Sequence, residues 1–381
     1  MIFINIRLHN VLSLNLAFGE GSQRAVKTYQ ALSQSNRLDV TLEKSLADVG
    51  IGEEERNKLL KIKRQTIIDI IDECKKENIR IIPIYDSDYP GCLRNIQVPP
   101  LVLFVKGVLP NFDEEPTFCI VGPRNITEFG KRAAYSLARR LAKSGMIIVG
   151  GTASGGDYSV HTGTLSAGGR SVMVTADGII TQMNSKNYKL CENILKNGCI
   201  ISEKPPKYTA RKFSFPLRNR IMSGLSLGVA VVEAPEKSGT LITANHALDQ
   251  GKDVFVVPGK PTDKAYKGSN ELLRDGAIPL IDASDIFSRY VIRFCGQISI
   301  RRAYDDQSDK KLKKNSQKKS LSALSKEAQL VYNNLNKPEF STDDLCTLNL
   351  DSGILLSALT ELEIEHIIVS LPGGKYKISD Q

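Results

Sequence analysis

The stretch FCIVGPRNITEFGKRAAYSLARRLAKSGMIIVGG (residues 118–151) decides the fold of this chain. It begins and ends with short apolar runs, and the segment between them has the pattern of an amphipathic helix that Gly145 ends. One face of that helix collects apolar residues at helical spacing: Ala133, Ala134, Leu137, Ala138, Leu141 and Ala142. A buried strand, a helix and another buried strand in this order are typical of a parallel sheet covered by helices.

The same alternation extends over residues 79–259. Further short β-branched runs, with amphipathic segments between them, are IRIIPIY (79–85), LVLFVKG (101–107), SVMVT (171–175), CIIS (199–202), GVAVVEA (228–234) and DVFVVPG (253–259). We therefore expect an α/β domain over residues 76–292, built on a doubly wound, mostly parallel sheet with helices on both faces.

Three other segments complete the expected organisation. Residues 1–75 form a helical N-terminal domain, because the apolar residues recur at helical spacing: Leu59, Leu60, Ile62, Ile67, Ile70, Ile71 and Cys74. Residues 293–320 are a basic linker by composition, and they could also be an arm that touches nucleic acid. Residues 321–381 predict helices followed by a hairpin at Pro372–Gly374, which is a winged helix.

Composition bounds the class of protein. The chain has 381 residues and a formal charge of +9, from 51 Lys and Arg against 42 Asp and Glu, which permits a polyanionic partner. Its seven scattered cysteines include no Cys-x-x-Cys pair, so we expect reduced thiols in the cytoplasm and no zinc ribbon. No run of about 18 apolar residues occurs, so we expect no membrane partner.

Four loops are candidates for the functional site, because loops at strand ends face the open crevice of a doubly wound sheet. They cover residues 121–125, 150–157, 211–220 and 236–240. The second is rich in glycine, whose backbone amides can approach an anion. The third joins lysine and arginines to two phenylalanines, which suits phosphates and unpaired bases. The plainer interpretations are tight turns and solvated cations.

The familiar cofactor and catalytic signatures are missing. No Gly-x-Gly-x-x-Gly with a following acidic residue and no Walker A motif occurs, which disfavours NAD binding and ATP hydrolysis. His161 lies four residues after Asp157 and could serve in acid–base or metal chemistry, but a buried role in positioning a helix is favoured. We therefore name no catalytic residue, metal ligand or cofactor, and we expect a binding protein and not an enzyme.

Five stretches together resemble the DNA-processing protein A family (DprA, also called Smf). They are YDSDYPGCLRNIQVPPLVLFVKG (85–107), IVGPRN (120–125) with Gly130, GGTASGGDYSVHTGTLSAGGRS (150–171), FPLRNRIMSGLSLGVAVVEAPEKSGTLITANHALDQGKDVFVVPG (215–259) and GSNELLRDGA (268–277). The tail ALTELEIEHIIVSLPGGKYKI (358–378) is similar to the winged helix that many members carry. Three departures from the family pattern occur. Pro123 stands in place of serine or threonine; in the glycine loop Gly150 replaces serine, Ser154 replaces arginine and Gly156 replaces isoleucine; and Met183-Asn184 replaces Tyr-Pro.

The resemblance implies a Rossmann-like, cytoplasmic protein, usually a homodimer, that binds single-stranded DNA. Members protect incoming DNA during natural transformation (competence) and load the RecA recombinase on it for DNA recombination. Carried over by position, the DNA-binding residues are Arg124, Gly151, Gly155, Gly156, Lys212, Arg218, Asn219, Arg220, Ser238, Gly239 and Thr240, with Phe213 or Phe215 stacking on bases.

One alternative comes from another class of protein, the Rossmann-type nucleoside-monophosphate phosphoribohydrolases. Those enzymes share a glycine-rich loop and a later Pro-Gly-Gly-x-Gly-Thr-x-x-Glu motif. Here Ser238-Gly239-Thr240-Leu241-Ile242 is followed by Thr243, so the carboxylate that the hydrolysis requires is missing and this alternative is not favoured.

Overall fold

The computed structural model describes residues 5–45, 51–305, 324–335, 339–348, 350–364, 367–371 and 375–378. The chain divides into two compact units, Met1–Tyr304 and Asp305–Gln381, and each is described by itself. Among the described residues, no helix is both long enough and apolar enough to cross a bilayer.

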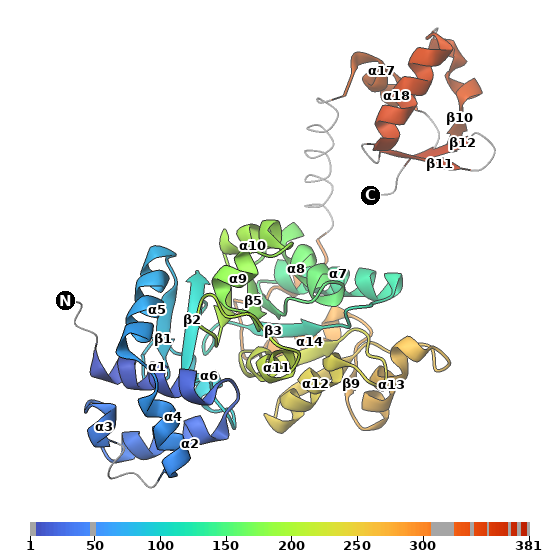
Figure 1. The fold of residues 1–381 in the computed structure, drawn as a ribbon. Helices are drawn as coiled ribbons and strands as arrows, with labels where there is room; N and C mark the ends of the chain where they lie inside the picture. Colours follow the sequence, from blue (N-terminus) through green and yellow to red (C-terminus); the bar gives the residue numbers. More distant parts are fainter. Residues whose placement is uncertain are drawn as a thin grey trace. The chain divides into compact units, whose positions relative to one another are not determined.

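The described part of the first unit has one sheet in the order β1-β2-β6-β5-β4-β3-β7-β8-β9 (Figure 1). Its strands are β1 (Arg80–Pro83), β2 (Val102–Gly107), β3 (Thr117–Val121), β4 (Ile147–Gly150), β5 (Ser171–Thr175), β6 (Cys199–Ser202), β7 (Gly228–Val231), β8 (Asp253–Val256) and β9 (Ile278–Pro279). The pairs β1–β2 and β2–β6 are antiparallel, and the other neighbours are parallel. The expected mostly parallel, doubly wound sheet is confirmed.

Helices precede and cover this sheet. Before it come α1 (Ile6–Phe18), α2 (Gln23–Gln34), α3 (Leu42–Ser45), α4 (Glu53–Leu60) and α5 (Arg64–Lys76). Within it come α6 (Gly91–Arg94), α7 (Glu128–Lys143), α8 (Gly156–Ser166), α9 (Ile179–Met183), α10 (Tyr188–Leu195), α11 (Ser214–Gly224), α12 (Gly239–Asp249), the 3-10 helix η1 (Lys264–Tyr266), α13 (Lys267–Arg274), α14 (Ala283–Tyr290) and α15 (Ile300–Ala303).

Two hydrophobic clusters fill the two faces of the sheet, and strand β3 contributes to both by alternation. Phe118 and Ile120 pack with α7 and α14, whereas Cys119 and Val121 belong to the cluster of α11 and α12. The predicted apolar face of α7 lies in the first cluster, and Gly145 follows the helix with a φ of +104° that favours glycine. The N-terminal helices α1, α2, α4 and α5 share the second cluster.

The strand order reverses beside β3. The chain proceeds from β3 through β4, β5 and β6 on one side, and then crosses to β7, β8 and β9 on the other. Loops at the carboxyl ends of β3 and β7 therefore leave toward opposite faces, and a crevice opens between them. This topological switch point is where a doubly wound sheet takes its ligand.

The sequence predicted eight of these strands and missed one. Strand β9 was not predicted because it has only two residues and one of them is Pro279. Residues 293–305, expected to begin the basic linker, instead extend the first unit: Phe294, Ile298 and Ala303 are buried in the cluster of α7 and α14. The rest of the expected linker, residues 306–320, lies outside the described residues.

The second unit is small and has its own core. Its elements are α17 (Lys326–Asn333), β10 (Glu339–Ser341), the 3-10 helix η2 (Thr342–Leu348), α18 (Ser352–Ile364), β11 (Ile368–Leu371) and β12 (Lys375–Ile378). The strands form an antiparallel sheet in the order β10-β12-β11. The described elements include helices followed by the antiparallel pair β11–β12, with β10 as an addition. The expected turn at Pro372–Gly374 lies outside the described residues, and the winged helix stays a prediction.

The close approach of two loops at the switch point gives a test of the fold. A Cβ at Gly156 would lie 2.7 Å from the Gly122 Cα, whereas a Cβ at Gly239 would meet nothing within 4 Å. We expect Gly156→Ala to lower the free energy of unfolding by about 1–3 kcal/mol, because overpacking forces the loops apart. Gly239→Ala, the matched control, should change it by less than about 0.5 kcal/mol. Equal effects in urea titrations would contradict this packing.

Candidate functional site

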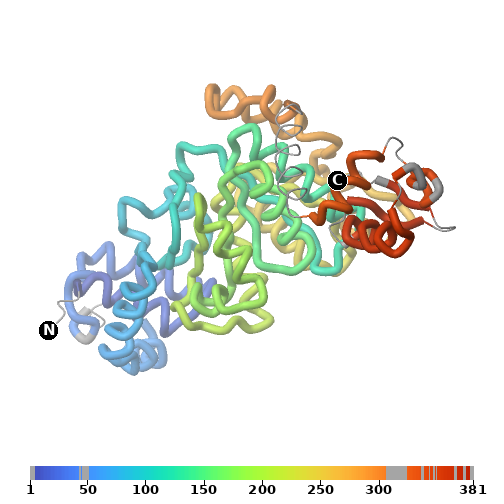
Figure 2. Tube along the Cα trace, turned by 90° about the horizontal axis from the view of Figure 1, so that it is seen from above, coloured from blue at the N-terminus to red at the C-terminus, as the bar shows by residue number. Residues whose placement is uncertain are grey.

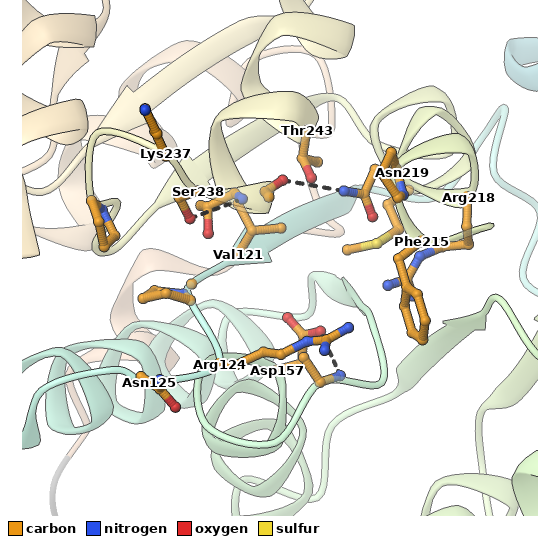
Figure 3. Close-up of a pocket in the computed structure, with 18 of the residues that line it drawn as sticks. Val121, Arg124, Asn125, Asp157, Phe215, Arg218, Asn219, Lys237, Ser238 and Thr243 are labelled. Atoms are coloured by element: carbon orange, nitrogen blue, oxygen red, sulfur yellow. Dashed lines mark hydrogen bonds between the residues drawn. The ribbon is translucent and has the colours of Figure 1, made fainter. Parts of the chain in front are cut away.

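A pocket of about 420 Å³ occupies the switch point. Three segments supply most of its lining (Figure 3): the β3–α7 loop, α11 with Lys212 before it, and the β7–α12 loop with the start of α12. Ala153 and Asp157, from the loop before α8 and the start of α8, complete the lining. Of the residues predicted from the sequence, eight line this pocket: Arg124, Lys212, Phe215, Arg218, Asn219, Ser238, Gly239 and Thr240. Five do not: Gly151, Gly155, Gly156, Phe213 and Arg220.

Three exposed cations line this pocket, and one of them lies over an aromatic ring. The Arg124 guanidinium lies over the Phe215 ring, 4.8 Å from its centre. Lys212 and Lys237 also line the pocket and are exposed. Within the described part of the chain, none of these three cations takes part in an ion pair, so all three remain available to an anionic ligand. Lys237 was missed as a site residue, although it stands beside Ser238 in a loop that the sequence singled out.

The pocket also has a buried pair of opposite charges, with Asp157 beside Arg124 and Arg218 beside Phe215 (Figure 3). Asp157 and Arg218 are both buried, and the Arg218 Nη1 donates to the carbonyl of Val174. The Asp157 carboxylate accepts a hydrogen bond from the backbone N–H of Ala153 at 3.0 Å. Burial raises the pKa of Asp157, while the neighbouring Arg218 opposes that shift. Together they fix the shape of the pocket floor.

Two amides of the glycine loop, which the sequence suggested for an external anion, bind a group of the protein itself. These amides, at Ala153 and Gly151, face the protein's own Asp157 carboxylate. A Cβ at Gly151 would lie 2.3 Å from Asp157 Oδ2, and one at Gly155 would lie 2.2 Å from the Arg124 carbonyl oxygen. Gly156 meets the backbone of Gly122, so these glycines allow protein segments, and not a ligand, to approach closely.

His161 is buried and positions helix α8, as the sequence favoured, by joining it to the glycine loop and to β5. It is fully buried, its Nε2 donates to the Gly151 carbonyl at 2.8 Å, and its Nδ1 lies 2.7 Å from the Ser171 hydroxyl. Burial lowers its pKa to about 4, which keeps the ring neutral. Among the described residues, no three His, Cys, Asp or Glu side chains gather as a metal site.

The prediction for Arg220 needs correction. Its guanidinium is buried and donates to both carboxylate oxygens of Glu203, at 2.7 and 3.0 Å, and to the Val98 carbonyl at 2.9 Å. A cation committed in this way has a structural role, because freeing it would leave a buried carboxylate unpaired. Phe213 is exposed but stands outside the pocket lining, so Phe215 is the aromatic residue of the pocket.

The remaining wall is the start of α12. The Ser238 hydroxyl accepts from the Thr240 N–H at 3.2 Å and caps the helix. Asn219 donates from Nδ2 to the Gly239 carbonyl at 3.3 Å, which ties α11 to α12 across the pocket (Figure 3). Thr243, at the position where the hydrolases carry glutamate, also lines the pocket.

The N-terminal helices hold the α11 segment in place, a role that the sequence did not reveal. Glu20, between α1 and α2, accepts a hydrogen bond from the Ser214 hydroxyl at 2.6 Å and pairs with the buried Lys204. A Cβ at Gly21 would lie 2.9 Å from a methyl carbon of Leu217. Figure 2 shows these segments side by side, although about 190 residues separate them in sequence.

Fold and pocket define a Rossmann-like protein with a cation-rimmed ligand pocket at its switch point. The chain belongs to the family described as DNA recombination-mediator protein A, whose model matches residues 80–291. The resemblance stated from the motifs is thus confirmed.

The chain is similar to individual relatives and solved structures. DNA processing protein DprA of Bacillus subtilis is 41% identical over 213 residues, which span 56% of this chain and 72% of the relative. The X-ray structure of DNA processing protein A from Streptococcus pneumoniae is similar with a TM-score of 0.65 and 26% identity, over 76% of this chain and 98% of that one. A structure that describes the single-stranded DNA binding mode of DNA processing protein A from Helicobacter pylori is 29% identical to this chain, with a TM-score of 0.49. The match covers 54% of this chain and 93% of that one.

The neutral His161 makes the stability of the site dependent on pH. Its pKa is 6.5 in the unfolded chain and about 4 in the fold, so the unfolded chain binds the proton more tightly. The stabilisation is complete above pH 6.5 and is lost as the pH falls toward 4, by about 3 kcal/mol. We expect the free energy of unfolding of His161→Gln to depend less on pH across this range. His9 and His246, whose pKa values are also lowered, are common to both chains and cancel in the comparison. Parallel pH profiles would contradict this assignment.

Proposed function

We propose that this chain binds single-stranded DNA in the pocket at the switch point and acts as a recombination mediator. The observation that carries the proposal is the Arg124 guanidinium over the Phe215 ring, with Lys212 and Lys237 exposed on the same pocket. Phosphates require cations, and unpaired bases require flat apolar faces, so the combination suits a nucleic acid whose bases are accessible.

The position of the aromatic ring favours single strands over duplex. Phe215 is half-buried in a concave pocket between three loops, and it is not on a convex surface. A base stacked within a duplex offers no free face, whereas an unpaired base can enter and stack. Duplex DNA could reach the rim cations but not the ring.

The described lining of this pocket lacks the glutamate carboxylate that the alternative, a phosphoribohydrolase, would need for its reaction. Among the described residues that line the pocket, Asp157 is the carboxylate, and it is buried and accepts hydrogen bonds from its own loop. Thr243 stands where the hydrolysis would need glutamate. A binding function therefore fits these residues better.

Two finer parts of the proposal rest on the family description. A recombination mediator delivers a strand to a recombinase, so we infer a RecA-type recombinase as protein partner and incoming DNA in natural transformation as the setting. We also propose a homodimer, because two linked sites raise the effective concentration of each for one strand.

Removing one of the exposed cations that line the pocket, here called the rim cations (Arg124, Lys212 and Lys237), tests the proposal. We expect Lys212→Ala and Arg124→Ala each to weaken binding of an oligothymidylate of about 20 nucleotides by about 1–2 kcal/mol. Each should also reduce the slope of log K against log salt by about 0.7. Lys76→Ala, at the exposed end of α5, removes the same charge away from the pocket and should leave both quantities unchanged.

The measurement is fluorescence anisotropy with labelled single strands and with a duplex of equal length. The wild-type chain should prefer the single strand. Equal affinity for the two, or equal losses from Lys76→Ala and Lys212→Ala, would overturn the assignment of this pocket.

A further inference from the structure

A second pocket of about 530 Å³ opens where α7 begins. Seven residues line it: Thr127, Phe129, Pro258, Gly259, Lys260, Asp263 and Tyr266. None of them lines the first pocket, and the proposed function uses none of them.

The exposed aromatic ring of Phe129, which packs against a buried tyrosine, forms one wall of this pocket. The Phe129 side chain is 61% exposed, and its ring meets that of Tyr266 edge-on, with centres 6.3 Å apart. Tyr266 is itself buried and packs on Gly259, where a Cβ would lie 1.9 Å from the ring. Phe129 therefore leaves ring surface open to solvent while its supporting neighbour is held in place.

A buried carboxylate fixes the helix end that carries Phe129. Glu233 is fully buried and accepts hydrogen bonds from the Thr127 N–H at 3.1 Å and from its hydroxyl at 2.5 Å. The negative charge of Glu233 thus already occupies the N-terminus of α7, which disfavours a phosphate at that place. The ligand chemistry left to the pocket is an apolar flat face on Phe129 and a cation on Lys260, together with the Asp263 carboxylate, which accepts a hydrogen bond from the Ala265 N–H at 2.9 Å.

The two pockets are lined by successive parts of one chain segment and of one edge of the sheet. Arg124 and Asn125 line the first pocket, and Thr127 and Phe129, a few residues later, line the second. On the other side, the loops after the adjacent parallel strands β7 and β8 supply Pro235 to the first and Pro258 to the second. A strand that leaves the first pocket along the carboxyl edge of the sheet meets the second one next.

We propose that the second pocket stacks a further base of the same single strand on Phe129, with Lys260 near its phosphate. This inference rests on the proposed function and extends it to a longer strand. It requires Phe129 to contribute to DNA affinity only when the single-stranded DNA is long enough to pass beyond the first pocket.

The absence of tryptophan from the chain gives a direct probe. Phe129→Trp introduces a single fluorophore at the proposed stacking face. We expect its emission to be quenched on saturation with an oligothymidylate of about 20 nucleotides, because bases stack on aromatic rings. Leu248→Trp, an exposed position at the far end of α12, is the control and should keep its emission.

The length of the oligonucleotide distinguishes binding at the second pocket from binding at the first one. Phe129→Ala should weaken binding of the long strand by about fivefold or more, and should leave binding of a strand of about four nucleotides unchanged. Unquenched Phe129→Trp emission while anisotropy reports binding would overturn the inference and leave the proposed function standing. Equal losses on short and long strands would also overturn it. Failure of the wild-type chain to bind either strand would overturn the proposed function, and this inference with it.

Discussion

The reversal of strand order between β3 and β7 is the constraint on which the rest of the site depends. Because the chain leaves these adjacent strands toward opposite faces, no loop or helix can cover their carboxyl ends, and the crevice between them stays open. The loops that border it must then be shaped by contacts with one another. Gly122 against Gly156, and Asn219 against Gly239, are such contacts, and both join segments from different strands.

Charged residues divide into two groups according to burial. Asp157, Glu203, Arg220 and Glu233 are buried and satisfied by neighbouring protein groups, so they fix the backbone and leave nothing for a ligand. Arg124, Lys212 and Lys237 are exposed at the pocket. Breaking a buried pair costs much more than removing an exposed cation. The internal charges therefore govern stability, and the rim charges govern binding in the function we propose.

Much of the fold and part of the site could be predicted from local sequence. Apolar runs located eight strands, and the loops after them located the pocket. The pattern could not show that Arg220 would be bound within the protein, because Arg220 turns to Glu203, 17 residues away. Nor could it show that Asp157 would occupy the amides of the glycine loop, or that Glu20 would hold Ser214 across 194 residues. Those outcomes depend on tertiary contacts that composition and periodicity do not encode.

Hydrogen–deuterium exchange of the full chain, with and without saturating oligothymidylate, tests the central claim most directly. The account predicts slower exchange in the three segments that line the first pocket, residues 121–125, 212–219 and 235–240. Exchange at the opposite, amino end of the sheet, around residues 112–117 and 250–253, should not change. Protection confined to that end, or to residues 324–378 of the second unit, would contradict the placement of the ligand at the switch point.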